Sequence, residues 1–211
     1  MKKLLILSAL VLTQTGLMAQ TKMEANATPK KEAVSHDPSH WAIDPVHSSV
    51  KFSVSHMTIS EVEGSFKKFD GYIQSQAPDF NNAKIRFTVD VNSITTDNDM
   101  RDKHLKSDDF FNAEKYPDIS FVSTSFKKVK GSVYVLEGNL TIRDVTKKVK
   151  LAVMYGGTIK DPMGSVRAGF KASGKISRKD FGLKWNKLTE AGGAVVGDEV
   201  TMMVNVEFTQ K

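Results

Sequence analysis

The stretch VTMMVNVEFT, residues 200–209, decides the fold class, because apolar and polar side chains alternate along it. Its even positions are all apolar: Val200, Met202, Val204, Val206 and Phe208. Its odd positions are polar apart from Met203. Successive side chains of a strand point to opposite faces, so this period of two predicts a β-strand with one buried face.

The same alternation recurs upstream in 50–54, 85–91, 119–121 and 149–155, and three less regular segments, 66–73, 133–142 and 166–176, are expected to add three more strands. Turn residues such as Gly156-Gly157 and Asp161-Pro162 separate the later segments. We therefore predict an all-β protein, an antiparallel eight-stranded lipocalin-like barrel with one or two short helical inserts. A β-sandwich is the alternative architecture. An eight-stranded barrel has an interior that side chains fill or that holds one small ligand.

Three segments depart from regular alternation. In 133–142 the apolar parity changes around Gly138, which predicts a bulge or bend there. Residues 98–114 are dense in charge and predict one or two helical turns, with Asp97 or Asp99 as the N-cap. Residues 187–194 are the second candidate insert.

The N-terminal residues divide the chain into three parts. Two lysines, an apolar run and the small-residue ending Leu17-Met18-Ala19 predict a signal peptide over residues 1–19, cleaved after Ala19. An uncleaved anchor is the alternative, although polar residues interrupt the apolar run early. Residues 20–39 have no sustained period and are expected to be a flexible tether. The lipid-binding β-barrel domain is expected to span residues 40–211.

Composition excludes several classes of function. The chain has no cysteine, which rules out disulfides, a catalytic thiol and a lipoprotein anchor. We therefore expect a soluble secreted protein in the periplasm. Its 30 basic and 24 acidic residues give a net charge of +6, and the surplus is dispersed along the sequence. No basic block with interleaved aromatic residues suggests nucleic-acid binding, while a mild attraction to anionic membrane surfaces is open.

One motif points to a family. Residues 101–111 read RDKHLKSDDFF, and Tyr116-Pro117 follow. This pattern resembles the signature of the YceI-like family. Four more stretches agree in order: WAIDPVHSSVKF (41–52), GSFKKFDG (64–71), LTIRDVTKKV (140–149) and ISRKDFGL (176–183). The resemblance covers nearly all of residues 41–211. One departure is Asp144, where the family pattern has glycine, and both residue types tolerate a left-handed turn.

The resemblance implies a lipocalin-like barrel that binds polyisoprenoids, isoprenoid quinones or other long-chain lipids. It implies no enzymatic activity and no cofactor beyond the bound lipid. The expected partners are the lipid ligand and, transiently, a membrane surface; a homodimer is open.

Candidate site residues follow from the inward parity of the strands. The expected contacts to an apolar tail are Phe52, Val54, Phe87, Val89, Phe121, Val153, Met202, Val204 and Val206. Arg101 and His104 are candidates for a polar head group. The competing interpretation, which we favour, is that Arg101, Asp102 and Asp109 form a network that pins their segment across one end of the barrel.

Two other functions remain as alternatives. A metal-dependent hydrolase could use the Arg101–Asp109 segment, since His104 and Asp108 would share one helix face. Ser107 lies off that face, so the spacing does not make a Ser/His/Asp triad. No metal site is predicted, because His36 and His40 flank Pro38 and no helix presents them together. The third function is a ligand-free structural or stress protein with a filled barrel.

Overall fold

A computed structural model describes residues 38–188 and 193–211. The signal peptide predicted for 1–19 and nearly all of the predicted tether lie outside the described residues. The strands are β1 (Ser39–His56), β2 (Ser60–Phe66), β3 (Phe69–Ser75), β4 (Lys84–Asp90), β5 (Ile94–Thr95), β6 (Asp118–Lys130), β7 (Val133–Ile142), β8 (Val145–Lys160), β9 (Val166–Ser177) and β10 (Val196–Gln210). The helices are η1 (Val91–Ser93), α1 (Asp99–Lys106) and η2 (Arg178–Phe181).

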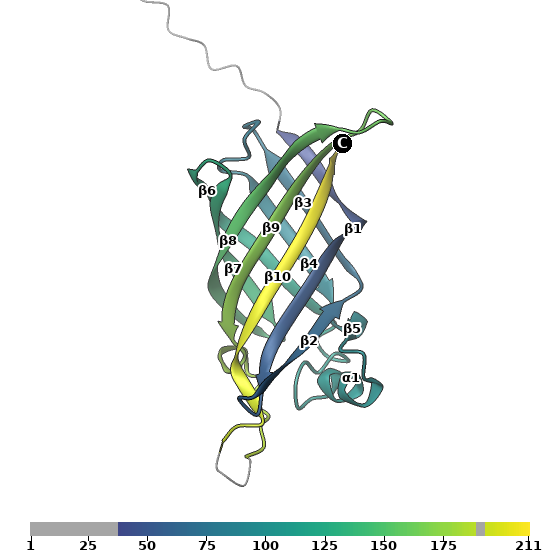
Figure 1. The fold of residues 1–211 in the computed structure, drawn as a ribbon, viewed down its shortest axis with the longest axis vertical. Helices are drawn as coiled ribbons and strands as arrows, with labels where there is room; N and C mark the ends of the chain where they lie inside the picture. The colour runs from purple at the N-terminus through teal and green to yellow at the C-terminus, as the bar shows by residue number, and fades with distance from the viewer. Residues whose placement is uncertain (1–37, 189–192) are drawn as a thin grey trace, which may run out of the picture. The chain divides into compact units, whose positions relative to one another are not determined.

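The strands form one closed antiparallel barrel (Figure 1). β10 pairs with both β9 and β1, from Trp41 opposite Gln210 to His56 opposite Val196, and this seam closes the sheet. β2 and β3 pair with different parts of β1, so together they make one member of the ring. β5 pairs with β2 and β4 pairs with β3, so β4 and β5 together make the next member. The ring therefore has eight members, two of them interrupted. The predicted eight-stranded barrel is confirmed, and the sandwich alternative is wrong.

One predicted strand is two strands. The segment 66–73 breaks at Lys67 and Lys68, whose backbone amides donate to the carbonyl and hydroxyl oxygens of Ser93 at 3.1 and 3.0 Å. The backbone amide of Asp90 donates to the Lys68 carbonyl at 3.0 Å. The backbone groups at this kink are therefore hydrogen-bonded to η1 and the residue before it. The apolar alternation of the sequence carries no signal of such bonds.

The bulge or bend predicted at Gly138 is found in the pairing with β6, opposite Gly138 and Glu137, and not in β7 itself. β7 is regular, and its inward positions are the even ones, including Tyr134 and Leu136. Val133 and Val135 face outward although they are apolar. For this reason the apolar positions of 133–142 suggested a change of face that the strand does not have. The irregularity lies in the partner strand β6, where the register shifts between Ser123 and Ser125.

Aromatic side chains close the end of the barrel that carries the β3–β4 loop. Phe80, in the loop between β3 and β4, is 2% exposed and lies 5.1 Å from both the Trp41 and Phe170 rings. Tyr134 stacks on Phe126 at 4.9 Å, and its hydroxyl donates to the Asp79 carbonyl at 2.5 Å. Phe80 adopts a φ of 60°, which a bulky side chain rarely does. We infer that burial of its ring compensates for that strained conformation.

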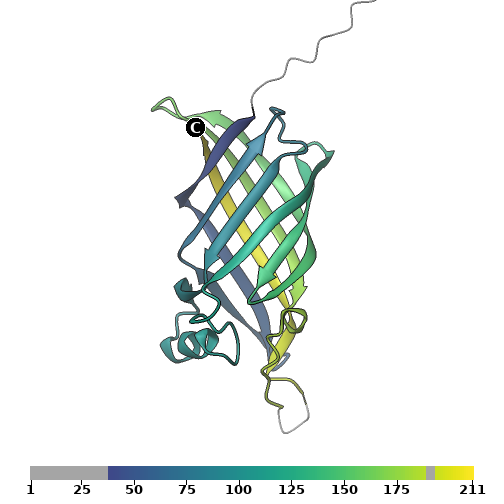
Figure 2. The same ribbon diagram turned by 180° about the vertical axis from the view of Figure 1, so that it is seen from behind.

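The opposite end carries α1, the β1–β2 hairpin and the segment after β9 (Figure 2). The N-cap of α1 is Asn98, which accepts from the Arg101 amide at 2.9 Å, so the predicted caps Asp97 and Asp99 are wrong. An amide oxygen caps as well as a carboxylate does, and sequence alone does not separate adjacent capping residues. Among the described helices none has the length and apolarity to span a membrane.

Candidate functional site

The barrel interior contains an apolar cavity of about 240 Å³. All nine predicted tail-contact residues line it: Phe52, Val54, Phe87, Val89, Phe121, Val153, Met202, Val204 and Val206. The lining surface exposes only apolar atoms. The sheet thus turns the inward-facing side chains of all its strands except β5 toward one shared space. That these residues contact a ligand stays a prediction.

Two glycines on the strands make room for aromatic rings of the lining. A Cβ on Gly64 would lie 2.3 Å from the Phe52 ring, and one on Gly71 would lie 2.6 Å from the Phe87 ring. Each glycine is paired directly with its phenylalanine on the neighbouring strand. The rings therefore occupy space beside the glycines that a neighbouring side chain would fill.

The cavity accommodates a hydrocarbon chain of limited length. About 240 Å³ is far above the roughly 10–15 Å³ that a single water-sized group needs, so the cavity has room for a segment of hydrocarbon chain. A longer chain would have to displace side chains or leave the barrel at one end.

Arg178 fastens one end of the cavity, and the sequence analysis did not single it out. It is 4% exposed, and its guanidinium donates to the carbonyls of Leu183, Trp185, Val196 and Gly197 at 2.6 to 3.2 Å. A fifth bond, at 3.5 Å, reaches the carboxylate of Asp198. Burial lowers the pKa of Arg178 from its ordinary value. The side chain ties the segment after β9 to the start of β10.

The only sequence signal for a role of Arg178 was its place in the family stretch ISRKDFGL. A charged residue in a turn usually indicates a solvated surface, so its burial could not be read from the sequence. Its carbonyl partners are main-chain groups with no residue-type pattern. The tertiary structure alone brings them together.

The two head-group candidates lie outside the cavity lining. Arg101 donates to the hydroxyl and carbonyl oxygens of Thr96 at 2.7 and 2.8 Å. Buried Asp102 accepts from the amide and hydroxyl of the same Thr96 at 2.8 and 2.6 Å. Burial raises the pKa of Asp102, but the hydrogen bonds from Thr96 outweigh it and the net pKa is lowered. These contacts hold α1 against the end of β5.

His104 joins α1 to the segment after β9. Its ring contacts Trp185 edge-on with centroids 4.9 Å apart, and Nε2 lies 2.8 Å from the Asp109 carboxylate. Ser107 donates its hydroxyl to the His104 carbonyl at 2.7 Å instead of approaching the imidazole. The geometry therefore does not assemble the nucleophile and base of a Ser/His/Asp triad. The residues of the 101–109 segment contact one another and the barrel end.

The turn at Asp144 keeps its shape by another route. The left-handed residue is Arg143, with a φ of 57°, while Asp144 accepts from the Tyr116 hydroxyl at 3.1 Å. Arg143 also donates to the Phe110 carbonyl at 3.2 Å. The turn therefore does not need a left-handed residue at position 144, and aspartate can stand there in place of glycine. Arg143 and Asp144 connect the turn to Phe110 and Tyr116, which follow α1.

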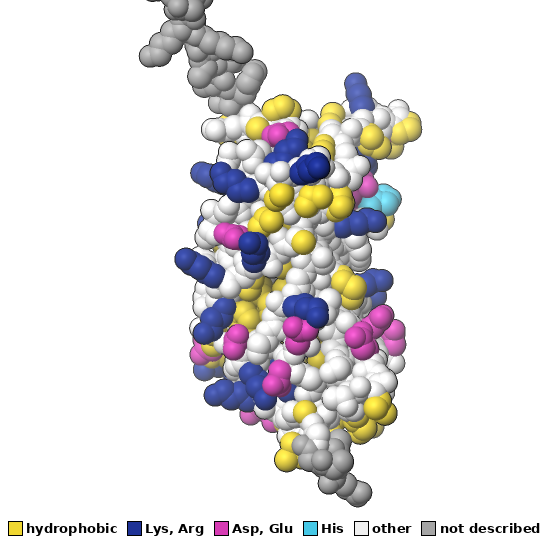
Figure 3. Space-filling view, turned by 60° about the vertical axis from the view of Figure 1, so that its left-hand side comes forward, with side chains coloured by type: hydrophobic (Ala, Val, Ile, Leu, Met, Phe, Trp, Pro, Cys, Tyr) yellow, Lys and Arg dark blue, Asp and Glu magenta, His cyan; other side chains and the backbone are white. Residues whose placement is uncertain are grey.

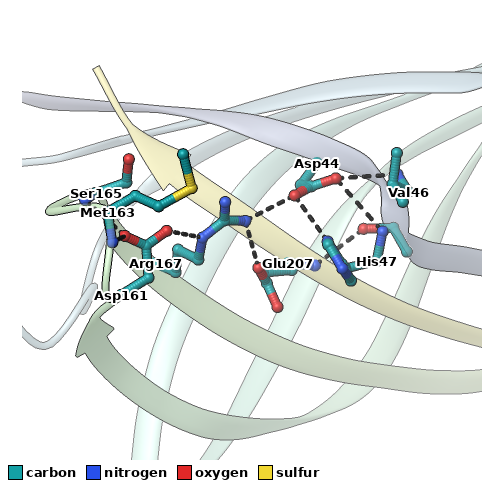
Figure 4. Close-up of polar contacts among 9 residues, drawn as sticks. Asp44, Val46, His47, Asp161, Met163, Ser165, Arg167 and Glu207 are labelled. Atoms are coloured by element: carbon teal, nitrogen blue, oxygen red, sulfur yellow. Dashed lines mark hydrogen bonds and ion pairs between the residues drawn. The ribbon is translucent and has the colours of Figure 1, made fainter.

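A charged network lies on the outside of the seam (Figure 4). Arg167 on β9 donates to Asp44, Asp161 and Glu207, each at 2.7 Å. His47 Nδ1 lies 2.9 Å from the Asp44 carboxylate. Hydrogen bonds from His47 and then Arg167 hold the pKa of Asp44 far below its usual range. The network clamps β1, β9 and β10 where the barrel closes.

Asp44, His47 and Glu207 also have ligand atoms within 4.8 Å of one another, a spacing that could hold a metal ion. Arg167 donates to both carboxylates. The positive charge between them is therefore supplied by a guanidinium, and a metal ion would have to displace it. The arrangement is better explained as an ion-pair clamp on the seam.

The clamp gives a pH-dependent prediction for His47. Its hydrogen bond to Asp44 raises the pKa of His47 above the ordinary value of about 6.5. A raised folded-state pKa adds stability that is complete below the unfolded pKa and is lost as pH rises through the folded pKa. The melting temperature of wild type should therefore exceed that of His47→Gln at about pH 5.5, and the difference should shrink by about pH 9. A difference that stays constant across this range contradicts the assignment.

Comparisons with known proteins agree on one family. Residues 41–208 match the model of the YceI-like domain. A UPF0312 protein of Staphylococcus aureus is 35% identical over 171 residues, which cover 81% of this chain and 97% of the relative. The crystal structure of the Campylobacter jejuni YceI protein shares 32% identity and a TM-score of 0.63, covering 74% of this chain and 90% of that chain.

A structure with lower sequence identity shares the fold. A polyisoprenoid binding domain from Saccharophagus degradans shares 17% identity with a TM-score of 0.60, covering 81% of this chain and 98% of that chain. At that identity the likeness concerns the fold alone. The closed barrel, the ordered motifs and the match over residues 41–208 lead to one conclusion: this chain belongs to the YceI-like family.

Proposed function

We propose that this protein binds one long-chain isoprenoid or similar lipid inside its barrel. The observation that carries the proposal is the wholly apolar cavity of about 240 Å³, lined by the inward faces of the closed sheet. A ligand with polar groups along its length would leave those groups without hydrogen bonds there. An extended hydrocarbon has none to lose. The structural neighbour from Saccharophagus degradans is a polyisoprenoid binding domain, which supports the same ligand class.

Transfer energetics suit a carrier or a store. Burial of each CH₂ stabilises a hydrocarbon by about 0.8 kcal/mol relative to water. A bilayer offers nearly the same gain, so exchange between membrane and barrel is close to neutral. The cavity needs only to match the bilayer in order to load and unload. Flexible Met202, which contributes to the lining, can adapt to an irregular chain.

The proposal includes export to the periplasm after cleavage at Ala19. It is supported by the basic head and apolar run of residues 1–19. The ligand-free alternative needs an interior filled by side chains, and the cavity argues against it. The enzyme alternative needs a nucleophile or metal beside a base, and the 101–109 segment instead hydrogen-bonds within itself and to Thr96.

Organic extraction tests the proposal directly. Protein purified from its own host should release close to one lipid molecule per chain, and mass spectrometry should identify a largely apolar tail. Native mass spectrometry before extraction should show the matching mass added to the chain. Protein that is monodisperse and folded but gives an empty extract in both measurements contradicts lipid binding.

A further inference from the structure

The charge of the chain is gathered on one side of the barrel. Residues 118–177, which contain β6 to β9, hold eleven basic and four acidic residues, a net of +7. The whole chain has a net charge of +6, so the remaining residues sum to −1. Figure 3 shows this side, where basic side chains outnumber acidic ones and hydrophobic side chains lie between them. Lysines that are dispersed in the sequence thus share one face.

A single row of paired residues defines the centre of this face. Lys130 on β6 is paired with Val133 on β7, Val133 with Met154 on β8, and Met154 with Lys171 on β9. Paired residues of an antiparallel sheet lie on the same face, and all four side chains are exposed. Val133 is 40% and Met154 46% exposed. The row therefore places two apolar side chains between two lysines.

The cations of this face are free to meet a partner. Lys130, Lys148 and Lys171 form no ion pair with any residue that the structure describes. Lys148 lies on the same outward parity of β8 as Met154. Lys150, between them, reaches Glu137 at 3.7 Å, but both side chains stay largely exposed. The face offers unneutralised positive charge around an apolar centre.

We propose that this face, defined by Lys130, Val133, Lys148, Met154 and Lys171, docks on the surface of an anionic lipid bilayer. Interfacial binding combines apolar side chains that enter the boundary between head groups and acyl chains with lysines that meet anionic lipids. The row has this composition. The inference rests on the proposed function in one respect: a lipid-binding barrel has to meet the membrane that supplies or receives its ligand.

A nucleic acid fits this face less well. Binding of single strands uses exposed aromatic side chains on which bases stack. The aromatic residues of β6 to β9 are buried or half-buried: Phe121, Phe126, Tyr134, Tyr155 and Phe170. The apolar pair Val133 and Met154 gains nothing from a hydrophilic polyanion. A bilayer uses both the charge and the apolar centre.

Vesicle co-sedimentation at low salt tests the docking face. Wild type should bind vesicles of equal parts phosphatidylcholine and phosphatidylglycerol, and hardly bind phosphatidylcholine alone. The triple variant K130Q/K148Q/K171Q should lose about tenfold or more in partition coefficient, because each lysine near an anionic surface contributes on the order of a fivefold gain. V133S/M154S should also bind more weakly. The N-terminal residues are the same in every variant, so differences report the face.

The matched control is K67Q/K68Q/K84Q, which removes three exposed lysines from the β2–β3 turn and from β4, outside the proposed face. It should bind the mixed vesicles like wild type. Equal losses in control and triple variant overturn the proposal, since binding would then follow total charge. Wild type that binds soluble heparin but not the mixed vesicles overturns it as well. Uptake of the apolar dye N-phenylnaphthylamine without vesicles should be unchanged in all variants, which separates a failed docking face from a failed cavity.

Discussion

Replacing Ala172 with Trp should abolish lipid binding while the barrel stays folded. Ala172 lines the cavity, where it is paired with Val153 on β8 and Val204 on β10. The indole adds nine non-hydrogen atoms to a cavity of about 240 Å³. At about 0.8 kcal/mol for each excluded CH₂, the loss corresponds to far more than a tenfold drop in affinity. Extraction with mass spectrometry and N-phenylnaphthylamine fluorescence measure it.

The matched control is Ala152→Trp. Ala152 lies on the outward face of β8, exposed and paired with Ser173. The chemical change is the same, but the added indole points to solvent. The control should retain wild-type lipid content, and both variants should keep the circular dichroism of a β-protein. Full lipid content in folded Ala172→Trp would show that the ligand does not occupy this cavity.

Replacing Arg178 with Met should give the largest loss of stability in the chain. The substitution removes the guanidinium that donates to the carbonyls of Leu183, Trp185 and Gly197, and it leaves the Val196 carbonyl with only the Asn186 amide as donor. Removal of one partner from a buried charged network costs about 3–5 kcal/mol. For a domain of this size that lowers the melting temperature by roughly 10 °C. Thermal unfolding followed by circular dichroism measures the shift.

Lys179→Met is the control for that loss. Lys179 is adjacent in sequence and its ammonium lies 2.8 Å from the carboxylate of Asp198, the residue that Arg178 also reaches. The Lys179 pair is exposed to solvent, so its removal should change stability by less than about 1 kcal/mol. Similar melting temperatures for the two variants would contradict a fastening role for Arg178. Because Arg178 holds the segment at the cavity end, its variant should also release lipid faster.

The fold and the inner face could be predicted from the sequence. Strand alternation is a local property, because the period of two depends only on neighbouring residues. It placed the inward positions of 200–209 and 149–155 correctly, and the closed pairing then brought all nine predicted residues to one cavity. The alternation failed where local pattern and burial disagree, as for Val133 and Val135, whose apolar side chains face outward.

The remaining features depend on contacts between residues far apart in the chain. The sequence by itself determined an antiparallel β-protein with one apolar face on each strand, since hydrophobic periodicity must be buried, and it left barrel and sandwich open. Only the tertiary structure decided that the sheet closes around a cavity, and that Gly64 and Gly71 lie against aromatic rings from other strands. It also decided that Arg178 is buried, and that lysines dispersed over residues 118–177 share one face. Strand pairing and closure set those distances, and no local pattern encodes them.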